Sequence, residues 1–108
     1  MDKGQKQHNR RLELHEKLCE ILGSEYVYFD PPNGLMMNYP CIVYKKSGNS
    51  TLHADNKPYF VKKQYDVTTI SRDPDNNIGD KIAQMLHCGY STSFVKDNLH
   101  HDVYKLYY

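Results

Sequence analysis

Hydrophobic and polar positions alternate most regularly in residues 57–75, KPYFVKKQYDVTTISRDPD. Read with a period of two, one face of this stretch carries mainly apolar or aromatic side chains, which are Tyr59, Val61, Tyr65 and Val67. This period, together with the β-branched and aromatic content, predicts a half-buried strand over residues 58–71. At about 3.3 Å per residue, such a strand is roughly 45 Å long. We therefore expect it either to bend around a core or to project beyond it.

Residues 39–46 (YPCIVYKK) predict the preceding strand. The polar connection 47–57, which contains Gly48 and Asn49, is typical of a long loop between two antiparallel strands. The pattern thus predicts a β-hairpin from strands 39–46 and 58–71. Its distal half is expected to extend beyond the part of the sheet that helices can cover.

Two segments show the helical period, with apolar residues three or four positions apart. They are residues 10–22 and 78–87, for which Asn9 and Asn77 are the expected N-caps and Gly23 and Gly89 the expected stops. Residues 1–8 are polar and without period, so we expect them to be flexible. The expected core residues of the two helices are Leu14, Leu18, Ile21, Leu22, Ile78, Ile82 and Leu86.

The remaining segments read as a short strand at 25–29 and two strands at 90–95 and 99–108, joined by a turn at residues 96–98. The element order α-β-β-β-α-β-β predicts a single α+β domain over residues 1–108. We expect an antiparallel sheet of four to five strands, with both helices packed on one face and a long β-hairpin. The last strand is apolar on both faces, so it is either central in the sheet or covered by another subunit.

Composition narrows the functional classes only a little. Fourteen basic and thirteen acidic residues leave a net charge of +1, which gives no basic excess for binding nucleic acid. No apolar run is long enough to cross a bilayer, and the polar start lacks the apolar segment of a signal peptide. The expected location is therefore the cytosol of the cell that makes the protein. The three cysteines form no CxxC pair and are expected to be reduced thiols.

Candidate catalytic and metal-binding residues are weak. His87-Cys88 and His100-His101 are adjacent pairs without the spacing of zinc ligands, and neighbours on a strand point to opposite faces. Asp73 and Asp75 are explained by a turn followed by a helix start. The sequence has no GxSxG, phosphate-loop or HExxH motif. We expect neither an enzyme nor a cofactor nor a metal site.

Interface residues are the stronger candidates, because ten tyrosines and no tryptophan favour surfaces that are apolar on one side and wet on the other. The hairpin mixes aromatic residues with lysines, and the loop 30–38 (DPPNGLMMN) carries apolar side chains that either tuck under the domain or meet a partner. The alternative interpretation, which is the more common role of such lysines, is that they are solvated and protect a sheet edge from pairing. The candidate subunit or tube contacts are Tyr44, Lys45, Lys46, Tyr59, Phe60, Lys62, Lys63, Met36 and Met37.

Several segments together resemble a known family. An amphipathic first helix and a proline-rich loop are followed by YPCIVYK, by ISRDPDN and by the ending DNLHHDVYKLYY. This succession is similar to the small tail-completion or tail-terminator proteins of long-tailed bacteriophages, often described as minor capsid proteins. The resemblance runs from Leu12 to Tyr108, and its most specific parts are residues 72–75 and 97–101.

The resemblance implies a homo-oligomeric ring, usually hexameric, on the last disc of the tail tube. Such a ring ends tube polymerisation and presents the surface to which the head is joined. Its implied partners are the tail tube protein, a head-completion or connector protein and genomic DNA, which passes through the lumen without sequence-specific binding. The implied location is the tail-neck region of the virion, after assembly in the bacterial cytoplasm, with no membrane and no cofactor involved.

Two alternatives stay open. The chain could be another neck component, either a head-completion or a connector-adaptor protein, since these are also small ring-forming proteins. The other alternative is a small cytosolic binding or regulatory module, either monomeric or dimeric.

Overall fold

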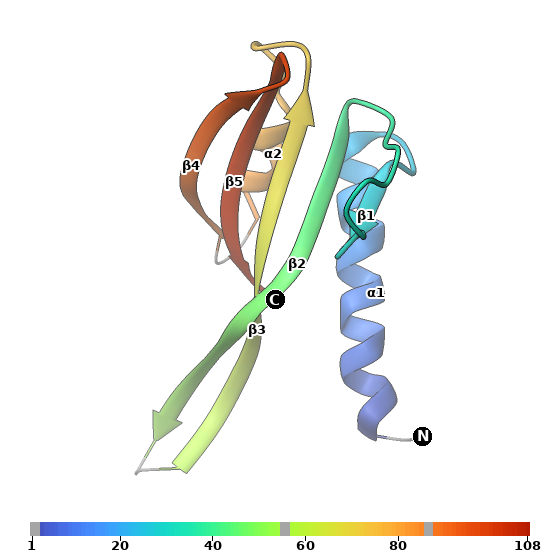
Figure 1. The fold of residues 1–108 in the computed structure, drawn as a ribbon. Helices are drawn as coiled ribbons and strands as arrows, with labels where there is room; N and C mark the ends of the chain where they lie inside the picture. Colours follow the sequence, from blue (N-terminus) through green and yellow to red (C-terminus); the bar gives the residue numbers. More distant parts are fainter. Residues whose placement is uncertain (1–2, 55–56, 86–87) are drawn as a thin grey trace.

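The computed structural model describes residues 3–54, 57–85 and 88–108, with side chains described outside residues 3–9 and 49–62. The fold belongs to the α+β class, as expected (Figure 1). Its elements in chain order are α1 (Lys3–Leu22), β1 (Val27–Phe29), β2 (Cys41–Ala54), β3 (Lys57–Ser71), α2 (Ile78–Ala83), β4 (Cys88–Lys96) and β5 (Leu99–Tyr107).

The five strands form one sheet in the order β1-β2-β3-β5-β4. The prediction of a purely antiparallel sheet is wrong, because β1 runs parallel to β2 while the other three pairs are antiparallel. A parallel connection usually needs a helix to return the chain to the same end. Here β1 has only three residues and is about 10 Å long, so the loop 30–40 suffices to carry the chain back.

The hairpin is longer than the sequence predicted. β2 pairs with β3 from Cys41 opposite Ile70 to Ala54 opposite Lys57, so the expected loop 47–57 is strand as far as Ala54. Polar residues can occupy this part because a ribbon without a covered face needs no apolar alternation, and β3 supplies the backbone partners. The register shifts after Lys46, which marks a bulge where the covered part of β2 ends.

The distal half of the hairpin projects away from the other strands, as Figure 1 shows. We call residues 47–54 of β2 and 57–62 of β3 the arm. β5 pairs with β3 only from Gln64 onward, apart from the two backbone bonds between Lys63 and Tyr108. The arm therefore makes the molecule elongated, with principal extents of 49, 28 and 24 Å.

Helix α1 starts at Lys3, so Asn9 lies inside the helix and is not its cap. Most of residues 3–9 are lysine and glutamine, which tolerate the helix well, and no proline stops it. The predicted helix start at residue 10 is therefore seven residues too late. Gly23 ends the helix as expected, with φ +81° and its N–H donating to the carbonyl of Cys19 at 2.8 Å.

Helix α2 is shorter than predicted and ends at Ala83, while Gly89 lies in β4 and does not stop the helix. The expected residues Leu86 and His87 lie outside the described residues. Asp80 lies in the first turn, where its negative charge opposes the positive end of the helix dipole.

The side chain of Asn77 makes no cap hydrogen bond. Instead, Oδ1 of Asn76 accepts from the N–H of Ile78 at 3.2 Å. In the turn before the helix, Oδ1 of Asp73 accepts from the N–H of Asp75 at 2.9 Å and closes a side-chain turn. The Asp-Pro-Asp segment is therefore a turn, as predicted.

One hydrophobic cluster holds the two helices against the same face of the sheet, which we call the inner face. The four central residues of the predicted stripes, Leu14, Leu18, Ile78 and Ile82, are buried. Ile21 and Leu22 are half-buried against the cluster. The sheet contributes Val27, Ile42, Tyr44, Tyr65, Val67, Tyr104 and Leu106. The last strand, β5, lies between β3 and β4, so it is central in the sheet order, which is one of the two places that its pattern predicted.

Candidate assembly surfaces

The adjacent histidines of β5 face opposite sides of the sheet. The ring of His101 stacks on Phe94 with 4.6 Å between centroids, and its Nδ1 lies 3.0 Å from the carbonyl oxygen of Leu99. Among the residues that the structure describes, no three His, Cys, Asp or Glu side chains come close enough to share a metal ion.

The three cysteines are free thiols in the structure. Cys41 is fully buried, and burial raises the pKa of its thiol to about 11. Burial also raises the pKa of Cys88 and of Cys19, with the nearby carboxylate of Glu25 adding to the effect at Cys19. At neutral pH these groups are protonated, and a protonated thiol is a poor nucleophile.

Tyr44 is part of the core and cannot contact another subunit through its side chain, which corrects its assignment to the interface. It is fully buried, and its hydroxyl lies 2.7 Å from Nδ1 of His15 and accepts from Nη1 of Arg11 at 3.4 Å. Burial raises the pKa of this hydroxyl, and the hydrogen bond from Arg11 opposes the shift. The alternation of β2 turns Tyr44 inward, under α1.

Lys45 and Lys46 are both exposed. Lys45 lies opposite Asp66 on β3, and Asp66 lies opposite Lys105 on β5. The carboxylate of Asp66 forms an ion pair with Lys105, with 3.1 Å between Oδ1 and Nζ. These three residues form a charged row on the face of the sheet away from the helices, which we call the outer face. Lys46, opposite Tyr65, lies on the inner side.

The other candidate interface residues of the hairpin lie in the arm or at its base. Lys63 is half-buried at the base of the arm, where its backbone N–H and carbonyl both bond to Tyr108, at 3.3 and 3.0 Å. Tyr59, Phe60 and Lys62 belong to the arm by their backbone, and their side chains lie outside the described ones. The structure thus brings four of the expected residues to the arm and its base without placing all their side chains.

The loop 30–40 presents Met36 to solvent with 92% of its surface exposed, whereas Met37 is half-buried. The N–H of Asn38 donates to the hydroxyl of Tyr28 at 3.3 Å, which ties the loop to β1. Met36 is therefore an exposed apolar side chain on a tethered loop. The same loop lines a shallow cleft of about 660 Å³, with residues Tyr26, Leu35, Met36, Met37, Asn38, Tyr39 and Arg72.

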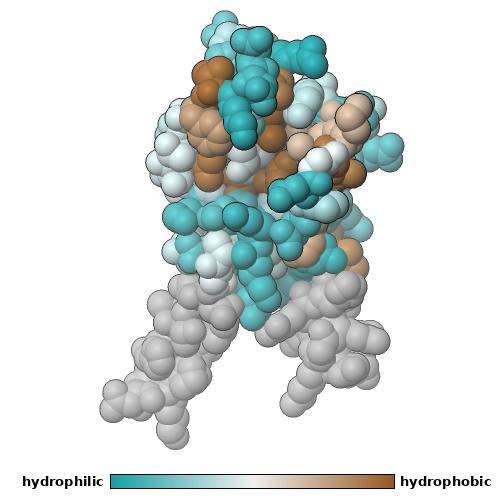
Figure 2. Space-filling view, viewed as in Figure 1, coloured by the Kyte–Doolittle hydropathy of each residue, from teal (hydrophilic) through white to brown (hydrophobic). Residues whose placement is uncertain are grey.

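Sequence reasoning missed the exposed apolar side chains of β4. Tyr90, Phe94 and Val95 are 57%, 47% and 62% exposed, although each lies in a strand. Hydrophobic residues also show at the upper end of the body on the side seen in Figure 2, above a hydrophilic zone. The available signal was the absence of any charged residue from position 88 to position 95.

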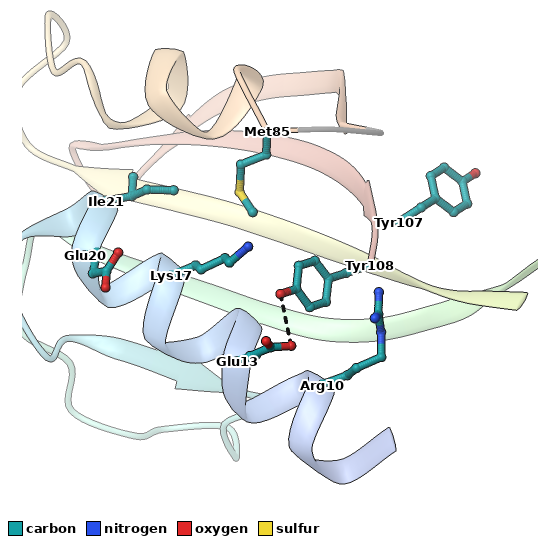
Figure 3. A pocket seen from close by; sticks show the side chains of 8 residues that line it. All are labelled: Arg10, Glu13, Lys17, Glu20, Ile21, Met85, Tyr107 and Tyr108. Atoms are coloured by element: carbon teal, nitrogen blue, oxygen red, sulfur yellow. Dashed lines mark hydrogen bonds between the residues drawn. The ribbon is translucent and has the colours of Figure 1, made fainter. Parts of the chain in front are cut away.

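A groove of about 550 Å³ separates α1 from the end of β5 (Figure 3), lined by Arg10, Glu13, Lys17, Glu20, Ile21, Met85, Tyr107 and Tyr108. The ring of Tyr108 lies 4.9 Å from the guanidinium of Arg10 and 5.3 Å from the ammonium of Lys17. Its hydroxyl donates to Glu13 at 3.4 Å. These contacts fasten the C-terminal residue to α1, so the polar face of the helix has a structural role that the sequence did not reveal.

In comparisons with known proteins, no family model matches this sequence, and neither the curated proteins nor the solved structures give a match. In the part of the chain that the structure describes, no helix is long and apolar enough to span a bilayer.

Proposed function

We propose that this chain is a structural virion protein that forms a ring on the end of a bacteriophage tail tube. In this role the ring ends tube polymerisation, and it offers the surface to which the head is joined. The ring is built from copies of the chain, hexameric by the resemblance, and contacts the tail tube protein on one side and a head-completion or connector protein on the other. DNA passes through its lumen without sequence-specific contacts.

The arm is the observation that carries the proposal. A two-stranded ribbon is marginally stable by itself in water, because it has no layer packed on either face. The arm nevertheless continues the β2–β3 ladder to Ala54 and Lys57. A contact with another subunit or with the tube would give such an extension a packing partner.

Two further features support assembly. The exposed Met36 and the apolar side chains of β4 are surfaces that a protein without partners usually keeps small. The resemblance in residues 72–75 and 97–101 falls on two turns, which set the entry to α2 and the β4–β5 hairpin.

The direct test is electron microscopy of negatively stained tails assembled with and without the protein. A terminator caps tails at one length, and its omission should give overlong tubes. Tails of normal length that fail to join heads would instead identify the chain as a head-completion or connector protein. Normal, head-joined tails in its absence would overturn both assignments and leave the small binding module.

A double substitution, Tyr59→Ser with Phe60→Ser, tests the arm within that assay. We expect the domain to stay folded and tail capping to be lost, because aromatic side chains dominate many interfaces. Leu12→Ser, at a position 41% exposed on α1, is the control and should cap normally. Thermal unfolding followed by circular dichroism comes first: a double variant that unfolds shows that the two rings pack on their own subunit.

A further inference from the structure

Two edges of the sheet have the features of strands that await a partner. β4 is the last strand in the sheet order, and its second edge pairs with no other described strand. The other edge is that of β2, which β1 covers only at residues 42–44. From residue 45 to residue 54, no described strand lies on that side of β2.

Soluble proteins commonly protect open edges with charged residues or proline. The arm edge of β3 follows this rule, since residues 57–62 include two lysines and Pro58. The arm edge of β2 does not, because residues 47–54 (SGNSTLHA) carry no lysine, arginine, aspartate, glutamate or proline. The molecule therefore guards one edge of its arm and leaves the other without these features.

The edge of β4 is similarly unguarded. Residues 88–95 (CGYSTSFV) contain no charge and no proline, and Lys96 follows only at the end of the strand. Tyr90, Phe94 and Val95 remain exposed beside this edge. A bulge after Tyr90 interrupts the pairing with β5, but from Thr92 to Lys96 the register is regular. The two unguarded segments have the same length and both contain several serine or threonine residues, which pair favourably across strands.

The topology lets these edges meet only between two copies. The free edges of β2 and β4 face opposite directions in the sheet, with β3 and β5 between them. Three successive antiparallel pairs, β2–β3, β3–β5 and β5–β4, make β4 antiparallel to β2. Copies that point the same way can therefore join β4 to the next β2 as an antiparallel pair, the more stable kind.

We propose that the β2 edge of the arm, residues 47–54, pairs with the β4 edge, residues 88–95, of a second copy of this chain. The contact is heterologous, so each copy gives one edge and receives one, and repetition builds a ring if the rotation closes. Along the strand direction, residues 47–54 lie beyond the residues of β2 that are level with β4. Pairing them with β4 of another copy therefore shifts successive copies along the strands by about eight residues, or roughly 26 Å. The choice of a second copy of the chain as the partner rests on the proposed function, in which the chain forms a ring.

The test uses one variant for each edge. We call the β2 edge of the arm the donor edge and the β4 edge the acceptor edge. The donor variant replaces residues 49–63 with Asn-Gly, a two-residue turn that joins Gly48 to the opposite Gln64 and removes the arm. For the acceptor edge, Thr92→Pro and Ser93→Pro are made separately, because backbone N–H groups alternate between the neighbour and the open edge. The proline variant that keeps the native unfolding midpoint has lost an N–H that points to the open edge, so it blocks only that edge. The other variant has lost an N–H that bonds to β5, and it serves as the control. Thr92→Lys serves if both proline variants unfold.

Sedimentation velocity up to the solubility limit gives the readout. The intact chain should associate, each variant alone should stay a monomer, and an equal mixture of the two should stop at a heterodimer. Amide hydrogen exchange should show residues 88–95 of the donor variant protected only in that mixture. Association of the donor variant alone would indicate β4–β4 pairing, and association of the acceptor variant alone would indicate arm–arm pairing. Either result overturns the proposal, as does an intact chain that remains a monomer.

The tail assay separates this proposal from the proposed function. If the protein caps tails and both edge variants also cap them, the function stands and the edge pairing is wrong. If the intact chain assembles edge to edge but does not change tail length, the pairing stands and the terminator function is wrong.

Discussion

Tyr44 and His15 show how one buried pair of side chains changes the meaning of a sequence pattern. On the strand pattern alone, Tyr44 was an aromatic residue beside two lysines and a plausible contact. In the structure it joins β2 to α1, with its hydroxyl 2.7 Å from the imidazole and with Arg11 beside both groups. Burial lowers the pKa of His15 below its ordinary value of 6.5, and the positive charge of Arg11 lowers it further, against a smaller opposing effect of Glu16.

This pKa shift predicts a pH dependence of stability. His15 is neutral in both states well above pH 6.5, so it has no effect there. As the pH falls through 6.5, the unfolded chain binds a proton that the folded chain resists, and the free energy of unfolding decreases until the folded pKa is passed. Urea unfolding of the native chain and of His15→Gln across this range should give a smaller decrease in the variant. Equal decreases would show that the shift does not affect stability.

At the scale of two packed elements, the contact between α2 and β5 depends on a glycine. A methyl group on Gly79 would overlap the hydroxyl oxygen of the buried Tyr104 and lie 3.1 Å from its ring carbon Cζ. An ordinary helix position favours alanine over glycine by about 1 kcal/mol. Here close approach outweighs that preference, because the ring of Tyr104 is enclosed and cannot move aside freely.

Gly79→Ala should therefore lower the free energy of unfolding by about 1 to 2 kcal/mol, the cost of overpacking less the gain in helix propensity. Gly89→Ala is the matched control: an added methyl group meets no atom within 4 Å, and its stability should be unchanged or slightly higher. Denaturant unfolding measures both. A stabilised Gly79→Ala would show that α2 can shift away from β5.

Helix α1 gives a second prediction between elements. Leu18 is fully buried, whereas Leu12 on the same helix is 41% exposed. Leu18→Ala should destabilise the domain by about 2 to 5 kcal/mol, because it leaves a cavity between α1 and the sheet. Leu12→Ala should change the unfolding midpoint little. Similar midpoints for the two variants would mean that the helix packs with a different face.

The whole molecule divides into a packed body and an arm. The body holds the described core cluster, which joins both helices to the inner face of the sheet. We expect most of the stability of the fold to reside in this packed cluster. The arm is a ladder of backbone bonds, and such regions open locally at lower cost than a core.

Removing the arm by replacing residues 49–63 with Asn-Gly should shift the thermal midpoint by less than about 5 °C, which corresponds to roughly 1 kcal/mol for a domain of this size. Differential scanning calorimetry measures the midpoint. In the intact monomer, hydrogen exchange should be faster in the arm than in residues 65–70 of β3. A large loss of stability without the arm would show that it contributes to the core.

The sequence by itself determined the elements whose patterns are local. The stripe around Leu14 and Leu18, the stop at Gly23 and the long alternating strand all follow from side-chain period and backbone freedom. The turn between β4 and β5 belongs here too. It was predicted at residues 96–98, and the structure narrows it to Asp97 and Asn98, which have φ +54° and +62° and connect the two strands.

Only the tertiary structure decided the features that depend on a partner strand or helix. Residues 47–54 are polar and read as a loop, yet the ladder with β3 makes them a strand. The parallel β1 depends on where the loop 30–40 returns, and the burial of Tyr44 depends on α1 lying above it. The open edge of β4 likewise depends on strand order, which a local pattern cannot specify because non-local pairing chooses the neighbours.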